Sequence, residues 1–228
     1  ILHYHYKPGG VSKVVQNTER ILAETAPEIR TVTIGGDGAK APISGIDYSS
    51  GESLADATTL VASLRDAARA SLGGPPDLWH IHNHSLGKHP ALVETIDRLA
   101  KQGPGILLHI HDFAEDGRPA NHRVLREGEG GIAKLYPVAP HIHYAVLNQR
   151  DYAFLHNLGV PPENLHHLPN PVHAPDISTE DTDQLEIPGD RFHLYPVRAV
   201  RRADDRDEPN REPVEISVGG FRDGRVEA

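Results

Sequence analysis

The chain has 228 residues, enough for one sizeable domain with its own core and part of another. Lys and Arg number 23 against 32 Asp and Glu, so the net charge of −9 argues against nucleic acid and anionic membrane surfaces as partners. The absence of cysteine excludes disulfides and thiol chemistry, and no apolar run reaches the roughly 18 residues of a membrane span, so a cytoplasmic protein is expected.

The first elements predict a strand, a glycine turn and a helix. Residues 1–4 are apolar and aromatic, and Pro8-Gly9-Gly10 interrupts them before apolar residues begin to recur at helical spacing from Val11. A β-branched run at 29–34 predicts a second strand, and apolar residues that recur between 54 and 72 predict a second amphipathic helix, which is expected to stop at Gly73. This alternation is typical of an α/β protein.

The same alternation continues to about residue 168. Strands are expected at 78–82, 105–111, 143–147 and 165–168, with helices at about 92–99 and from Gln149 to Gly159. Residues 115–131 are polar and rich in glycine and show no apolar period, so they are expected to form a mobile loop over the ligand crevice. The whole pattern predicts a Rossmann-like, mostly parallel sheet with helices on both faces.

The sequence divides into three parts. The alternating elements occupy residues 1–173, which are expected to form one domain. The acidic stretch that follows lacks a core period, which predicts a linker at 174–190. An apolar run then begins within 191–228 and gives way to charged residues, so this part is expected to be the start or a fragment of a second domain.

Four short motifs follow one another along the chain. They are Pro8-Gly9-Gly10-Val11, Asp77-Leu78-Trp79-His80-Ile81-His82, His111-Asp112, and the run from Leu158-Gly159-Val160-Pro161 to Pro169-Asn170. Together they resemble the amino-terminal half of retaining glycosyltransferases of the GT-B fold, in the large family 4. The resemblance covers roughly residues 3–202 and implies an acceptor-side domain, followed by a second domain that binds the nucleotide sugar.

The resemblance also implies nucleotide-binding residues that this chain has only in part. Family members hold the nucleotide through an Arg and a Lys a few residues apart, and through a spaced pair of Glu. Arg198 stands in the Arg position, but Ala203 stands where the Lys is expected, and the tail has no Glu pair with the family's spacing. We therefore expect a second domain that is only partly represented, with Arg198 and Arg202 binding the diphosphate. The other interpretation is a protein that does not transfer sugars.

Residues at the predicted strand ends are candidate ligand contacts, because an open α/β sheet binds its ligands there. By the resemblance, His111 would touch the transferred sugar or its acceptor, and Asp112 would orient that imidazole or an acceptor hydroxyl. The alternatives are a half-buried strand histidine and an aspartate that caps a turn. His82 and Asn83 close the neighbouring strand, and they would supply substrate contacts or ordinary loop polarity.

The glycine turn near the start is a further candidate. Gly9 and Gly10 let backbone amides approach a phosphate or a sugar hydroxyl at a helix N-terminus, with Lys7 beside them for an anionic group. A plain tight turn and a solvated lysine explain the same residues equally well.

The 16 histidines raise a different class of function, a metal-dependent hydrolase that would use His80, His82 and His84, or His109, His111 and Asp112. Alternate strand residues share a face, so two such histidines could bind one ion. The first and last histidines of the first set would lie roughly 13 Å apart, which makes that set difficult to close on one metal. The four-motif resemblance implies a retaining hexosyltransferase that uses a nucleotide-diphosphate sugar, and we expect no metal or other cofactor. A non-catalytic sugar-binding relative stays open.

Overall fold

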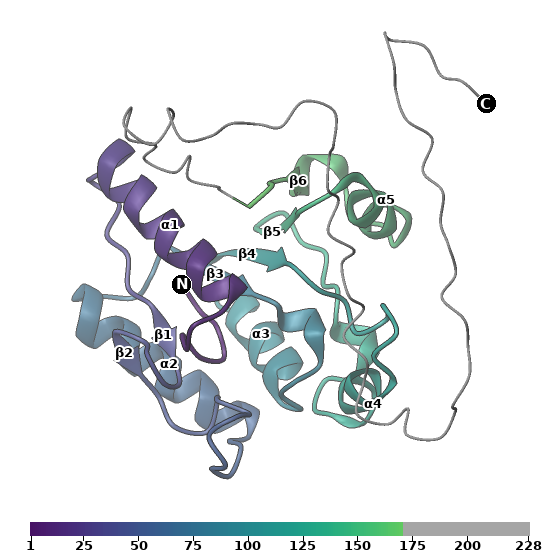
Figure 1. The fold of residues 1–228 in the computed structure, drawn as a ribbon, viewed down its shortest axis with the longest axis horizontal. Coiled ribbons are helices and arrows are strands. Elements are labelled where there is room, and N and C mark those ends of the chain that lie inside the picture. Colours follow the sequence, from purple (N-terminus) through teal and green to yellow (C-terminus); the bar gives the residue numbers. More distant parts are fainter. Residues whose placement is uncertain (171–228) are drawn as a thin grey trace, which may run out of the picture. The chain divides into compact units, whose positions relative to one another are not determined.

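The computed structural model describes residues 1–170, in which a parallel sheet is flanked by helices (Figure 1). The strands are β1 (Ile34–Gly35), β2 (Ala41–Pro42), β3 (Leu78–His82), β4 (Gly105–Ile110), β5 (Ile142–Val146) and β6 (Leu165–His167). The α-helices are α1 (Gly10–Thr25), α2 (Ala57–Leu72), α3 (Leu92–Ala100), α4 (Pro119–Glu127) and α5 (Gln149–Asn157). All the strand pairs of this part of the chain are parallel, which confirms the α/β class.

The first residues lie inside the sheet without forming a regular strand. Leu2 bridges Ile34 on one side and Ile81 on the other, both in parallel. The strand expected at 1–4 is therefore reduced to a bridge, and the strand expected at 29–34 is reduced to β1. The backbones approach closely here, because a side chain at Gly35 would collide with the carbonyl oxygen of His3.

The order of the strands places helices on both faces of the sheet. Leu2 lies between β1 and β3, and the sheet continues in the order β3, β4, β5, β6. The chain moves across the sheet in one direction from Leu2 through α1 to β1. It moves in the opposite direction from β1 through α2 to β3, and from β3 through α3 to β4. Right-handed crossovers then place α1 on one face and α2 and α3 on the other, where these two helices lie side by side (Figure 1). The arrangement is consistent with a Rossmann-like domain.

The two faces of the sheet differ in chemistry because side chains alternate along each strand. One face carries the buried apolar residues of the three central strands, which pack with α2 and α3 in the main core: Trp79, Ile81, Ile106, Leu108, Ile110, Ile142, Tyr144 and Val146. Full burial of each such side chain stabilises the fold by roughly 1.5–3 kcal/mol. The opposite face carries His80 and His82 on β3 and His109 at the end of β4.

The expectation of a loop without helical structure at 115–131 is wrong, because α4 occupies Pro119–Glu127. Leu125 is the buried residue of this helix, and it packs in a small apolar cluster with Val93, Ala114 and Leu135. A single buried leucine gives no apolar period. The signal that the sequence does carry is Pro119 at the start of the helix, where the missing N–H costs nothing.

Other predicted boundaries are confirmed. Gly73, with φ 78°, ends α2, and Gly159, with φ 97°, follows α5. Over residues 1–170, no helix combines the length and the apolar character that a membrane span requires. The predicted linker at 174–190 and the predicted second domain at 191–228 lie outside the described residues.

Candidate functional site

The carboxyl ends of β3 and β4 bring four of the predicted residues together. The strands pair in parallel with His82 opposite His109, so the residues that follow each strand meet at one edge of the sheet. Asn83 follows β3, and His111 and Asp112 follow β4. His82, Asn83, His111 and Asp112 are here called the strand-end cluster.

Asn83 connects the two strand ends. Its side-chain oxygen accepts hydrogen bonds from the backbone amides of His111, at 2.8 Å, and Asp112, at 3.0 Å. Its side-chain nitrogen lies 3.3 Å from Oδ2 of Asp112, and its own carbonyl accepts from the Tyr4 hydroxyl at 3.1 Å. The backbone of Asn83 is left-handed, with φ 58°, a conformation that asparagine tolerates better than most residues. The side chain predicted as a substrate contact thus shapes the turn that presents His111 and Asp112.

His111 is held as a neutral imidazole. Nε2 of His111 lies 2.9 Å from Nδ1 of His82, a hydrogen-bonding distance. Burial lowers the pKa of His111 to about 4, although the nearby charge of Asp112 opposes this shift. At neutral pH the ring can therefore accept a hydrogen bond or a proton, as a group that positions a substrate hydroxyl must.

Asp112 pairs with an arginine that the sequence reasoning missed. Arg118 donates to Oδ1 of Asp112 at 2.7 Å and to the carbonyl of Phe113 at 3.0 Å. Both charged side chains are about one-third exposed, so a ligand can reach them from solvent. Arg118 lies in the glycine-rich stretch just before α4, and its sequence position gave no sign of this contact.

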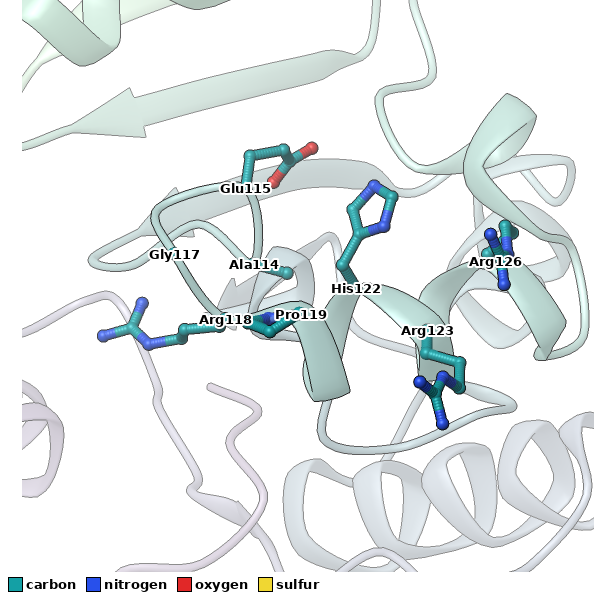
Figure 2. Close-up of a pocket in the computed structure, with 8 residues that line it drawn as sticks. All are labelled: Ala114, Glu115, Gly117, Arg118, Pro119, His122, Arg123 and Arg126. Carbon is teal, nitrogen blue, oxygen red and sulfur yellow. The ribbon is translucent and has the colours of Figure 1, made fainter. Parts of the chain in front are cut away.

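A basic pocket lies next to Asp112 and is built from the loop after β4 and from α4 (Figure 2). The pocket has a volume of about 510 Å³ and is lined by Ala114, Glu115, Gly117, Arg118, Pro119, His122, Arg123 and Arg126. The lining contains three arginines and one carboxylate, Glu115. Arg118 is paired with Asp112, and Arg126 lies 3.4 Å from a carboxylate oxygen of Glu127. Among the described residues, no hydrogen bond or ion pair engages the guanidinium of Arg123. A pocket of this composition suits an anionic ligand.

The glycine turn forms as predicted, but Lys7 points to other partners. Gly9 caps α1, which begins at Gly10. Nζ of Lys7 binds Oδ2 of Asp47 at 3.1 Å and Oγ of Ser49 at 2.8 Å. The structure therefore gives Lys7 two partners within the fold. A ligand role of Gly9 and Gly10 stays a prediction.

The remaining predicted residues are the two arginines expected to bind the diphosphate and the histidines considered for a metal site. Arg198 and Arg202 lie outside the described residues. Of the first histidine set proposed for a metal, His84 diverges, because its Nε2 lies 2.9 Å from the carbonyl oxygen of Leu135. The described part of the chain instead brings His80 and His82 together with His109, with one nitrogen of each ring within 4.8 Å of the others.

A search of curated proteins finds similarity to mannosylglucosyl-3-phosphoglycerate synthase from Petrotoga mobilis, at 30% identity over 230 aligned residues. The alignment covers 89% of this chain and 45% of the relative. The chain thus spans about half the length of this relative. No family model and no solved structure matches the chain.

This similarity supports the glycosyltransferase class implied by the four sequence motifs. The shared half includes the strand-end cluster and the basic pocket, since nearly nine-tenths of the chain is aligned. The GT-B fold, the nucleotide sugar and the retention of configuration stay predictions.

Proposed function

We propose that this chain is the acceptor-side part of a glycosyltransferase that moves a hexose from a nucleotide-diphosphate sugar to a phosphoglycerate-containing acceptor, with retention of configuration. The observation that carries the proposal is the basic pocket beside Asp112, in a chain similar to a synthase of a glycosylated phosphoglycerate. Cationic side chains at the edge of the sheet are suited to a carboxylate or a phosphate on the acceptor.

The acceptor would bind with its charged end in the pocket and its hydroxyls at the strand ends. Arg123, whose guanidinium has no partner among residues 1–170, would pair with a phosphate, and Arg118 lines the pocket and also binds Asp112. Neutral His111 would form a hydrogen bond with an acceptor or donor hydroxyl through Nδ1, the ring nitrogen that does not face His82. Positioning of this kind places the attacking oxygen against the sugar, which supplies much of the rate in a transfer reaction.

The donor side of the reaction belongs to the second domain in this proposal. The departing diphosphate needs positive charge, and Arg198 and Arg202 are the predicted sources in this chain. Both residues lie outside the described part of the structure, so their role is a sequence prediction.

The test is a transfer assay with the full-length protein. GDP-mannose, UDP-glucose and ADP-glucose serve as donors, and 3-phosphoglycerate and glucosyl-3-phosphoglycerate serve as acceptors. Mass spectrometry detects the product, and NMR of its anomeric proton reports retention or inversion. Absence of transfer with every pair would contradict the proposed donor and acceptor classes, and ligand-induced thermal stabilisation without turnover would indicate a non-catalytic sugar-binding protein.

Variants then separate the two parts of the site. His111→Ala should lower kcat by roughly 10²-fold, whereas Arg123→Ala should raise the acceptor KM by about 10-fold and leave the donor KM unchanged. Arg69→Ala is the matched control, since Arg69 is an exposed arginine on α2 and does not line the pocket. An equal loss in Arg69→Ala and Arg123→Ala would exclude a specific role for the pocket.

A further inference from the structure

The histidine face of the sheet gathers three imidazoles from two strands. His80 and His82 are alternate residues of β3, and His82 is the register partner of His109 on β4. Side chains of register partners in a parallel pair lie on the same face, so the three rings are neighbours. The rings of His80 and His82 stack with centroids 4.3 Å apart, and those of His82 and His109 lie 4.8 Å apart. Packing alone would favour apolar residues at such positions.

The distances between the ring nitrogens fit the ligand sphere of a transition metal. Nε2 of His80 lies 3.2 Å from Nδ1 of His109. Two nitrogens bound tetrahedrally to zinc, each about 2.0–2.1 Å from the ion, are separated by about 3.3 Å. One nitrogen of His82 completes a group whose members all lie within 4.8 Å of one another, so small ring rotations would close it.

The cluster also contains buried nitrogens that lack hydrogen-bond partners. His82 and His109 are only 1% and 2% exposed, and Nε2 of each is buried without a partner among the described residues. An unsatisfied buried polar atom costs about 1–3 kcal/mol, and an ion bound by Nε2 of His82 would remove one such cost. Nδ1 of His82 faces His111, which leaves Nε2 of His82 for a ligand.

His111 lies where it could hydrogen-bond to a metal-binding His82 and fix the orientation of its ring. An imidazole that binds a metal through one nitrogen usually donates the N–H of the other nitrogen to a neighbouring group. Nδ1 of His82 lies 2.9 Å from Nε2 of His111, which provides that acceptor. His80 and His111, the ring neighbours of His82, are both partly exposed.

We propose that His80, His82 and His109 bind one divalent transition-metal ion of the zinc class. Three imidazoles without a carboxylate favour Zn²⁺, Co²⁺, Ni²⁺ or Cu²⁺ over Mg²⁺ and Ca²⁺, which prefer oxygen ligands. The fourth position of a three-histidine site is left for water or a substrate atom. His82 and its neighbour His111 also belong to the strand-end cluster, but this proposal does not depend on the proposed glycosyl transfer, because it concerns metal binding, which is measured without turnover.

The test uses the full-length protein without a polyhistidine tag, stripped with chelator and then titrated with Zn²⁺ in a calorimeter. Binding of one ion per chain is expected, together with the intense visible absorption that Co²⁺ gives in a tetrahedral site. His80→Ala and His109→Gln should each weaken Zn²⁺ binding by more than about 10-fold. His80 is partly exposed, so its variant keeps the test valid if the buried variant fails to fold.

The matched control is His143→Ala on β5. His143 is paired with His166 at 3.0 Å on the same face of the sheet but outside the three-histidine group. Its loss should leave the tight binding unchanged. Absence of Zn²⁺ binding, or an equal loss in His143→Ala and His80→Ala, would overturn the proposal. Glycosyl transfer measured in chelator is a separate readout, so failure of either proposal can be recognised without the other.

Discussion

Replacement of Asn83 by alanine should lower the free energy of unfolding through two effects, lost hydrogen bonds and backbone strain. Asn83→Ala removes the acceptor of two backbone amides, at His111 and Asp112. Each lost hydrogen bond costs about 0.5–1.5 kcal/mol, since both residues are partly exposed and water can replace the acceptor. Alanine at φ 58° adds roughly 1 kcal/mol of backbone strain. The total expected loss of stability is about 2–4 kcal/mol.

Asn83→Gly is the matched control, because glycine loses the same hydrogen bonds but adopts the left-handed backbone without strain. It should be roughly 1 kcal/mol more stable than Asn83→Ala. The assay is urea denaturation followed by circular dichroism, combined with hydrogen exchange at the amides of His111 and Asp112. If Asn83→Ala unfolds within 0.5 kcal/mol of wild type, as an order of magnitude, and those amides keep their protection, the assigned role of the side chain is wrong.

Three further predictions follow from other parts of the fold. The buried histidines should make the protein acid-sensitive. Burial lowers the pKa of His84 to about 4, so between pH 6.5 and 4 the unfolded state binds a proton that the folded state does not, and stability falls by up to about 1.4 kcal/mol per pH unit as the pH is lowered. Denaturation at several pH values checks this slope, and His84→Gln should flatten it. Gly36→Ala should lower the melting temperature, because a Cβ there would collide with the adjoining strand and loop, whereas Gly74→Ala, with open space around it, should not. Arg118→Met should change stability by less than about 1 kcal/mol, since its ion pair with Asp112 is partly exposed, but should lower transfer activity by about 10-fold; an unfolded variant, or an unchanged rate, would contradict this.

The sequence predicted those elements whose apolar period is strong. The strands at 105–111 and 143–147 and the helices at 92–99 and from Gln149 are found within one or two residues of their expected bounds. Glycine signals were equally reliable where the backbone is left-handed, as at Gly73 and Gly159. In these segments local pattern and tertiary packing favour the same structure.

The sequence failed where tertiary contacts decide the structure. The first strand is interrupted because Leu2 alone reaches both neighbours, and α4 is held by one buried leucine at 125. No apolar periodicity in the sequence indicates the interrupted first strand or the single buried leucine of α4. For the site, strand ends predicted which residues meet, but the contact between Arg118 and Asp112 depends on how α4 returns to the sheet.

The two histidine sets raised from the sequence for a metal differ from the group that the fold brings together. Sequence spacing compares residues of one strand, so it grouped His80 and His82 with His84, and His109 with His111 and Asp112. The register between β3 and β4 instead places His109 beside His82. Pairing between strands far apart in the chain is set by the whole sheet, and the sequence of one strand does not contain it.

The alternation of histidine and apolar faces also bears on how the sheet finds its pairing during folding. If β4 slipped by one residue against β3, the imidazole of His109 would turn into the helix-covered core, and Ile110 would turn out of it. Both changes are unfavourable, since a polar ring would lose its neighbours and an apolar side chain would lose its burial. The histidine row therefore helps to specify the register of β4 against β3, because a slipped pairing is penalised once the helices cover the apolar face.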